Sequence, residues 1–274
     1  FLGDNVYGDQ PNGELFKMKN AYEIQKTRLP KWLMKEKDIL AIWDDHDFGL
    51  NDGGRDYPFK EEAKKMFLNF WNVAEDDPRN YREGLYFKNI KNVDGAKIEI
   101  IALDTRFFRS KLNGKKNAYK PNINPQATIL GKKQWDWFQS SITNSTSKVI
   151  IILSSIQVLA TDHPYEKWAN FPLERSKLIK ILSEAAKDRT VIVVSGDRHR
   201  SGIYQNNFFI EITASSLNRP GSKFKESDPL LIGETFPEMN YGILDIQPLQ
   251  NRITLSLHDK KGEKLNSKII NFFQ

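Results

Sequence analysis

Three short segments of the sequence combine side chains that could hold metal ions. They are FLGDNVYGD at positions 1–9, IWDDHDFG at 42–49 and VSGDRHRS at 194–201. Each contains the end of an apolar run, and side chains just past the carboxyl ends of strands converge on one crevice in an α/β sheet. We therefore expect a single site that gathers carboxylate, imidazole and phenol groups: Asp4, Tyr7, Asp45, His46, Asp197 and His199.

The first segment has the chemistry to bind two cations. The Asp4 carboxylate can bridge two hard cations, and a Tyr7 phenolate favours a trivalent, iron-like ion. The alternative is that Gly3-Asp4-Asn5 is an ordinary turn between a strand and a loop. These residues alone leave both interpretations open.

The other two segments concentrate charge over a few positions. The acidic and imidazole side chains at 44–47 would be self-repelling unless a cation or an arginine neutralises them. Asp197 and His199 point the same way if the backbone is extended, which suits two neighbouring metal ions. The alternatives are a solvated acidic loop at 44–47 and, at 197–200, a polar loop whose arginines pair with local acids.

A fourth segment, LDTRFFRS at 103–110, places arginines just past another strand. Arginine binds tetrahedral oxyanions in a bidentate way, so Arg106 is a candidate phosphate clamp. An ion pair between Arg106 and either Asp104 or the acidic segment at 44–47 is the equally weighted alternative.

The composition narrows the class of protein. The chain has 274 residues, of which 39% are hydrophobic and 12% aromatic, enough for a well-filled core. No apolar run approaches the roughly 18 residues of a membrane span. Cysteine is absent from the sequence, so a metal here must be held by oxygen and imidazole. The net charge of +6 comes from dispersed Lys and Arg among 35 acids, which predicts no stable nucleic-acid partner but can steer anionic substrates.

Periodicity predicts mixed secondary structure. The stretch 44–58 is too rich in Asp, Asn and Gly for regular structure. We expect helices at 19–36 (divided by Pro30), 58–73, 131–142 and 173–187, and strands at 38–43, 85–90, 97–104, 148–155, 190–197, 208–215, 241–247, 252–259 and 268–273. This order predicts two sheets packed face to face with helices outside, in one domain spanning 1–274.

These segments, together with LGKKQWDWF (130–138) and SSIQV (154–158), resemble the PhoD-like alkaline phosphatases of the metallophosphoesterase, calcineurin-like superfamily. The resemblance covers most of the chain up to about residue 220. It implies an α/β fold, the four-layer α/β/β/α sandwich, with a metal cluster at the strand ends. It also implies that the family's first metal-binding segment, which includes a Cys, lies upstream of Phe1. We therefore expect a fragment that lacks N-terminal strand structure and a complete iron site.

Position by position, the resemblance implies roles for the site residues. Asp4 is the implied bridging ligand, and Tyr7 and His199 are the implied iron ligands. Asp45 and Asp197 replace neutral side chains of the superfamily motif, which fits the calcium that accompanies iron in this family, because calcium prefers carboxylate oxygen. The substrate-facing positions are His46 and Arg106. The superfamily's middle His is replaced by SSIQ, where Ser155 or Gln157 could fill its place weakly.

The implied activity is metal-dependent hydrolysis of phosphate esters by a metal-activated water. One alternative is a phosphodiesterase or phospholipase D-like enzyme acting on phospholipid or teichoic acid, with Tyr165 and Trp168 as lid residues that would decide. Another is a non-catalytic metal-binding surface protein. We expect a monomer without a membrane span, and the resemblance implies a secreted, periplasmic or cell-surface location.

Overall fold

A six-stranded sheet forms the centre of the fold in a computed structural model that describes residues 1–35, 38–223 and 225–272. The strand order is β1-β2-β5-β6-β8-β7. Four neighbouring strands, β2, β5, β6 and β8, run parallel, while β1 and β7 are antiparallel edges. The strands are β1 (Phe87–Val93), β2 (Ala96–Ala102), β5 (Val149–Ser154), β6 (Thr190–Ser195), β7 (Ser201–Gln205) and β8 (Ile210–Ala214).

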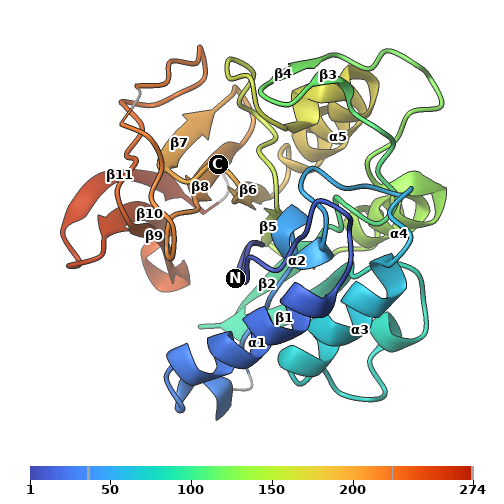
Figure 1. Cartoon of the computed structure of the whole chain (residues 1–274). Coiled ribbons are helices and arrows are strands. Elements are labelled where there is room, and N and C mark those ends of the chain that lie inside the picture. The colour runs from blue at the N-terminus through green and yellow to red at the C-terminus, as the bar shows by residue number, and fades with distance from the viewer. Residues whose placement is uncertain (36–37, 224, 273–274) are drawn as a thin grey trace.

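Two helices cover one face of this sheet. β5 is buried along its whole length, as expected for a central parallel strand with both faces covered. The helices α4 (Gly131–Thr143) and α5 (Pro172–Ala185) lie on one side of the central strands (Figure 1). Their buried apolar residues form a core with the strands: Trp135, Phe138, Leu178 and Leu182.

A second, three-stranded sheet packs on the opposite face. Its strands are β9 (Asn240–Gln247), β10 (Arg252–Asp259) and β11 (Lys264–Asn271), in the order β11-β10-β9. β10 alternates buried apolar and polar residues, so one face of this sheet points to the core. The residues shared by the two sheets include Ile151, Ile192, Ile212, Ile253, Leu255 and Leu257.

The N-terminal segment lies between this core and a further helical layer. A parallel bridge joins Leu2 to Ile42, and Ile42 packs in the core shared by the two sheets. The neighbouring side chains Ala41 and Trp43 pack instead with Phe67 of α3 (Lys60–Phe70). α1 (Phe16–Arg28) contacts α3 (Figure 1). The predicted α/β fold with outer helices on both sides is therefore confirmed.

The shorter elements lie in the connections. They are α2 (Asp45–Phe48), the hairpin strands β3 (Asn113–Lys115) and β4 (Ala118–Lys120), and 3₁₀ turns at Leu33–Lys35, Pro78–Asn80, Trp168–Asn170 and Pro248–Gln250. The predicted helices after Pro58, at 131–142 and at 173–187 are confirmed, as are the strands at 85–90, 97–104, 148–155, 190–197, 208–215, 241–247, 252–259 and 268–273, each within a few residues. Residues 36 and 273 of two predicted elements lie outside the described ranges.

Some sequence predictions need correction. The run 38–43 is not a strand, because its backbone pairs only with Phe1–Leu2 among the described residues and makes a single bridge there. The first helix ends at Arg28, as the proline two residues later disfavours further helical backbone. β7 was not predicted, because its Ser-Gly start hides its β character. The short helix α2 was also missed, for a reason that belongs to the site.

Candidate metal centre

The three predicted segments meet at one cavity of about 480 Å³. Five of the six predicted side chains line it: Asp4, Asp45, His46, Asp197 and His199. The Tyr7 hydroxyl lies 3.1 Å from His199 Nε2 and donates a weak hydrogen bond to Asp4 Oδ2 at 3.4 Å. All six predicted residues therefore come together, and their roles as ligands remain a prediction at this point.

The first two segments are joined by close backbone packing. Gly3 has a φ of +97°, and a Cβ there would lie 2.4 Å from the Asp44 Cβ, so only glycine fits. The Asn5 side-chain amide donates to Ile42 O at 3.0 Å and to Asp47 Oδ2 at 2.6 Å. These contacts hold the Asp4 loop directly above the acidic segment.

The acidic segment forms the helix α2 because two of its carboxylates cap it. Asp44 is the N-cap residue in extended backbone and forms a capping box with Asp47. Gly49, with a φ of +110°, ends the helix in the left-handed conformation. The expectation of irregular structure here was wrong for this reason. The short helix places Asp45 and His46 in its first turn, at the cavity.

Three predicted ligands adopt unusual backbone conformations. The φ angles of Asp4, Asp197 and His199 are 48°, 66° and 50°. The left-handed region costs a non-glycine residue about 1–3 kcal/mol and is concentrated at functional sites. The condition of extended backbone at 197–199 is therefore not met, although both side chains still reach the cavity.

Three carboxylates form what we call the acidic floor: Asp4, Asp45 and Asp197. Together with Asp44 they offer oxygen atoms within 4.8 Å of one another. Burial and the neighbouring carboxylates raise the pKa of Asp4 and of Asp197 well above the usual range. Burial also acts on Asp45, but the Arg106 guanidinium and His46 outweigh it and lower its pKa. Buried oxygens of Asp4 and Asp45 have no hydrogen-bond partner among the described residues. The floor therefore offers the negative charge and the unpartnered oxygen atoms that a cation requires.

Tyr7 and His199 form a second donor set beside the floor. Burial and the Asp4 carboxylate raise the pKa of the Tyr7 phenol, so it stays protonated unless a cation binds it. Burial and the nearby Arg219 lower the pKa of His199 to about 4, which keeps its imidazole neutral and able to coordinate a metal. Asp4, itself part of the floor, also contacts both members of this donor set.

His46 has a carboxylate partner that sequence reasoning missed. Its Nδ1 lies 2.7 Å from Asp9 Oδ1, and its ring centre lies 4.3 Å from that of Tyr7. Burial lowers the pKa of His46, but the hydrogen bond with Asp9 and the acidic neighbours raise it overall. The second GD pair in GDNVYGD was the available signal for Asp9.

Arg106 does not reach the cavity. Its side chain is fully buried, with Nη2 2.5 Å from Asp44 Oδ1 and Nη1 2.5 Å from Glu166 Oε2. The ion pair with the acidic segment, the alternative in the sequence analysis, is therefore what the structure contains. This geometry corrects the expectation that Arg106 is an accessible phosphate clamp.

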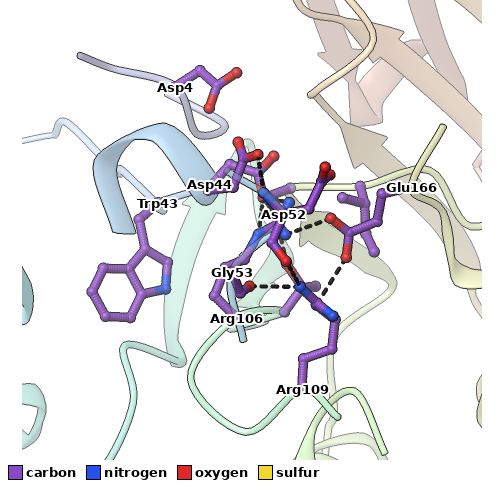
Figure 2. Close-up of polar contacts among 12 residues, drawn as sticks. Asp4, Trp43, Asp44, Asp52, Gly53, Arg106, Arg109 and Glu166 are labelled. Carbon is purple, nitrogen blue, oxygen red and sulfur yellow. Dashed lines mark hydrogen bonds and ion pairs between the residues drawn. The ribbon is translucent and has the colours of Figure 1, made fainter. Parts of the chain in front are cut away.

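Arg106 belongs to a buried group that we call the paired wall: Asp44, Arg106, Arg109 and Glu166. The Nε of Arg109 lies 2.9 Å from Glu166 Oε1, and its Nη2 donates to the carbonyls of Asp52 and Gly53. Figure 2 shows Glu166 joined by dashed lines to both arginines. The wall therefore fixes the position of the loop that follows α2.

The two polar residues of SSIQ lie behind the site. Ser155 donates to Asp44 Oδ1 at 2.5 Å, and the Gln157 amide donates to Thr213 Oγ1 at 2.9 Å. Neither side chain lines the cavity. Of the two predicted lid residues, Tyr165 lines the cavity, whereas Trp168 is fully buried in the core.

Cationic side chains line other parts of the cavity and were not predicted to do so. They are Lys116, from the turn between β3 and β4, and Arg198, Arg200 and Arg219. The site thus combines an acidic floor for cations with basic groups for an anion. Such an arrangement suits a phosphorylated substrate bound over metal ions.

A family model decides the assignment. The model of the PhoD-like phosphatase family matches residues 31–237. This chain belongs to the PhoD-like phosphatase family. The family and the acidic cluster together indicate divalent-metal binding.

Known relatives agree with the family. The chain is 24% identical over 133 residues to alkaline phosphatase D of Bacillus subtilis (strain 168), a match that spans 44% of the chain and 22% of that protein. A solved structure of PhoD superposes with a TM-score of 0.69 at 16% identity, over 98% of this chain and 62% of that one. GAP50, described as the anchor in the inner membrane complex of Plasmodium, gives a TM-score of 0.50 at 14% identity, over 70% and 55% of the two chains. The chain thus spans under two thirds of these relatives. Among the described residues, no helix has the length and apolar character to cross a bilayer.

Proposed function

We propose that the chain carries the catalytic site of a metal-dependent phosphate ester hydrolase. The observation that carries this proposal is the position of Asp4, which contacts two different donor sets. On one side are Tyr7 and His199, and on the other are Asp45 and Asp197. A carboxylate between two such sets is suited to bridge two cations.

The donor types favour different ions in the two positions. Phenol and imidazole on one side suit a trivalent iron, and carboxylates on the other suit calcium. The residues present fit cations, since buried oxygens of Asp4 and Asp45 have no hydrogen-bond partner in the part of the chain that the structure describes, and the two carboxylates repel one another. We therefore propose Asp4, Tyr7 and His199 as iron ligands, and Asp4, Asp45 and Asp197 as calcium ligands.

When bound, such cations supply Lewis acidity to the phosphoryl oxygens and lower the pKa of water. The chain's own residues contribute binding and proton transfer. His46 faces the cavity and donates a proton to the leaving oxygen, while Asp9 holds its ring through Nδ1. Within the paired wall, Arg106 pairs with Asp44, and Arg109 binds carbonyls of the loop after α2, so the two arginines hold Asp44 and this loop in place.

The fold alone does not establish hydrolysis, since GAP50, which shares it, is described as an anchor. The basic groups above the floor favour an enzyme over a purely structural metal site, because cations do not help to hold a metal. A phosphodiesterase remains the alternative within enzymes. Monomeric state, lack of nucleic-acid binding and secretion stay predictions of the sequence.

The test uses the full natural gene product and this chain side by side. Hydrolysis of a chromogenic phosphomonoester and its matching diester is measured at alkaline pH, and bound metals are quantified on the same samples. Turnover that disappears with a chelator and returns with iron and calcium supports the proposal. Metal-loaded protein that cleaves neither ester would refute it.

A further inference from the structure

Arg219 is a cavity residue to which the proposed function assigns no role. It lies in the exposed segment 217–220 that follows β8, and it lines the cavity with its neighbours Pro220 and Gly221. Its guanidinium carbon lies 5.0 Å from the centre of the Tyr7 ring. The arginine head is therefore held beside the donor set formed by Tyr7 and His199.

Arg219 differs from the other arginines near the cavity in its charge balance. Arg198 forms an ion pair with Glu226, and Arg200 Nε lies 3.5 Å from the same carboxylate. Arg106 is neutralised within the paired wall. Within residues 1–35, 38–223 and 225–272, no carboxylate forms an ion pair with the Arg219 guanidinium. Its positive charge is thus available to an anion in the cavity.

The segment that carries Arg219 is attached to two of the metal-binding loops. The Asn218 side chain donates to the Asp4 carbonyl at 3.1 Å. A Cβ on Gly221 would lie 2.2 Å from the His199 carbonyl oxygen, so the segment packs directly on that loop. Gly221 N also donates to Pro237 O at 2.9 Å. Arg219 is therefore held at a defined place relative to the floor.

We propose that Arg219 binds the phosphoryl group of the substrate and gives the site a preference for phosphomonoesters over phosphodiesters. This inference rests on the proposed function. A guanidinium offers two parallel N–H donors that match two phosphoryl oxygens. At alkaline pH a monoester carries two negative charges and a diester one. Because Coulomb attraction scales with charge, an unneutralised cation favours the monoester.

The experiment compares Arg219→Gln and Arg219→Lys with the wild type in the full natural gene product. A nitrophenyl phosphate and the bis-nitrophenyl diester are the substrates, and inorganic phosphate is titrated calorimetrically as a probe of anion binding. For Arg219→Gln we expect kcat/KM to fall about 100-fold for the monoester and about tenfold for the diester. Phosphate affinity falls with it, while metal content and melting temperature stay unchanged.

The remaining variants separate charge from geometry. Arg219→Lys retains the charge but not the planar fork, so an intermediate loss is expected. Arg55→Gln is the matched control, since Arg55 is an exposed arginine outside the cavity, and all readouts should stay at the wild-type value.

Other outcomes overturn the inference without touching the proposed function. If the wild type hydrolyses the monoester and Arg219→Gln lowers kcat/KM by the same factor for both esters, Arg219 does not set the preference. Unchanged phosphate affinity in both Arg219 variants shows that it does not contact the anion. If the wild type cleaves neither ester, the proposed function fails, and the phosphate titration still decides whether Arg219 binds an anion. If Arg219→Gln loses metal or melts lower, the decision rests on a second neutral variant, Arg219→Met, and wild-type ester preference and phosphate affinity in that variant overturn the inference.

Discussion

The acidic floor and the paired wall are adjacent and use the same kinds of charged side chain, but their charges are balanced differently. In the wall, Arg106 and Arg109 share the carboxylate of Glu166, and Arg106 also reaches Asp44. On the floor, Asp4 and Asp197 have strongly raised pKa values because they are buried beside other carboxylates. Charges that cancel locally stabilise the fold, whereas charges left uncancelled mark the site that binds a ligand.

The largest expected difference between the two regions lies in catalysis. Asp197→Asn removes a proposed ligand from the floor, so we expect hydrolysis to fall about 10³-fold and bound metal to decrease. The metal-free variant should nevertheless melt at a higher temperature than the metal-free wild type, because one repelling carboxylate is gone. Asp56→Asn, on a side chain that is 76% exposed, is the control. A metal-free variant that melts lower would contradict the repulsion argument.

Breaking the wall should cost stability instead. Arg106→Met leaves the buried carboxylates of Asp44 and Glu166 without their shared partner. We expect the free energy of unfolding to fall by about 3–5 kcal/mol, measured by denaturant titration. Arg55→Met, where the arginine side chain is 52% exposed, should change it by less than about 1 kcal/mol. Equal effects of the two substitutions would show that the wall does not stabilise the fold.

The contact between Asp9 and His46 tests whether the proposed proton donor beside the acidic floor depends on its carboxylate partner. His46→Gln removes the proposed proton donor, and we expect kcat to fall about 10²-fold. Asp9→Asn keeps the imidazole but weakens its orientation, so a loss of about tenfold in kcat with unchanged KM is expected. Steady-state kinetics with metal content measured in parallel checks both. An Asp9→Asn variant with wild-type kcat would remove Asp9 from the account.

The smallest effect concerns a buried histidine, His163, that faces cationic side chains. Burial and the facing cations Arg198, Lys167 and Arg200 lower the pKa of His163, so the folded protein keeps it neutral. The unfolded chain has an ordinary histidine pKa near 6.5 and takes up the proton first. The contribution of His163 is therefore intact above about pH 6.5 and is lost as the pH falls below it.

His163→Gln should weaken this dependence on pH. Between pH 7.5 and pH 5.5 we expect the variant to lose up to about 1.4 kcal/mol less stability than the wild type. Denaturant titrations at the two pH values measure the difference, with His258→Gln on the β10–β11 hairpin as control. The same loss in wild type and His163→Gln would exclude His163 as the source.

Much of the fold was predictable because its signals are local. The strands β5 and β6 read as continuous apolar runs, and Trp135 and Phe138 marked the buried face of α4. The run 38–43 has the same apolar character but forms only a bridge, since pairing depends on a partner elsewhere in the chain. The helix α2 depends on two Asp side chains capping one turn, which composition alone describes as a loop.

The candidate site also contains residues that could be predicted from local signals and residues that could not. The positions of Asp4, Asp45 and Asp197 could be predicted because each follows an apolar run, although only the run before Asp197 forms a strand and the other two share one bridge. The position of each arginine side chain could not be predicted from the sequence, because an arginine can reach several partners and only the fold determines which one it contacts. Arg106 was expected at the substrate and lies in the wall, whereas Arg219, in a segment without regular structure, lines the cavity. Long-range partners such as Asp9 for His46 were missed for the same reason.

Whether two cation sites share Asp4 can be measured by calorimetric titration of metal-free protein with calcium, before and after loading with ferric iron. We expect the wild type to bind both ions and Asp4→Asn to bind both more weakly, with calcium affinity falling about 100-fold or more. Loss of one ion alone, or full binding of both by Asp4→Asn, would contradict a shared carboxylate.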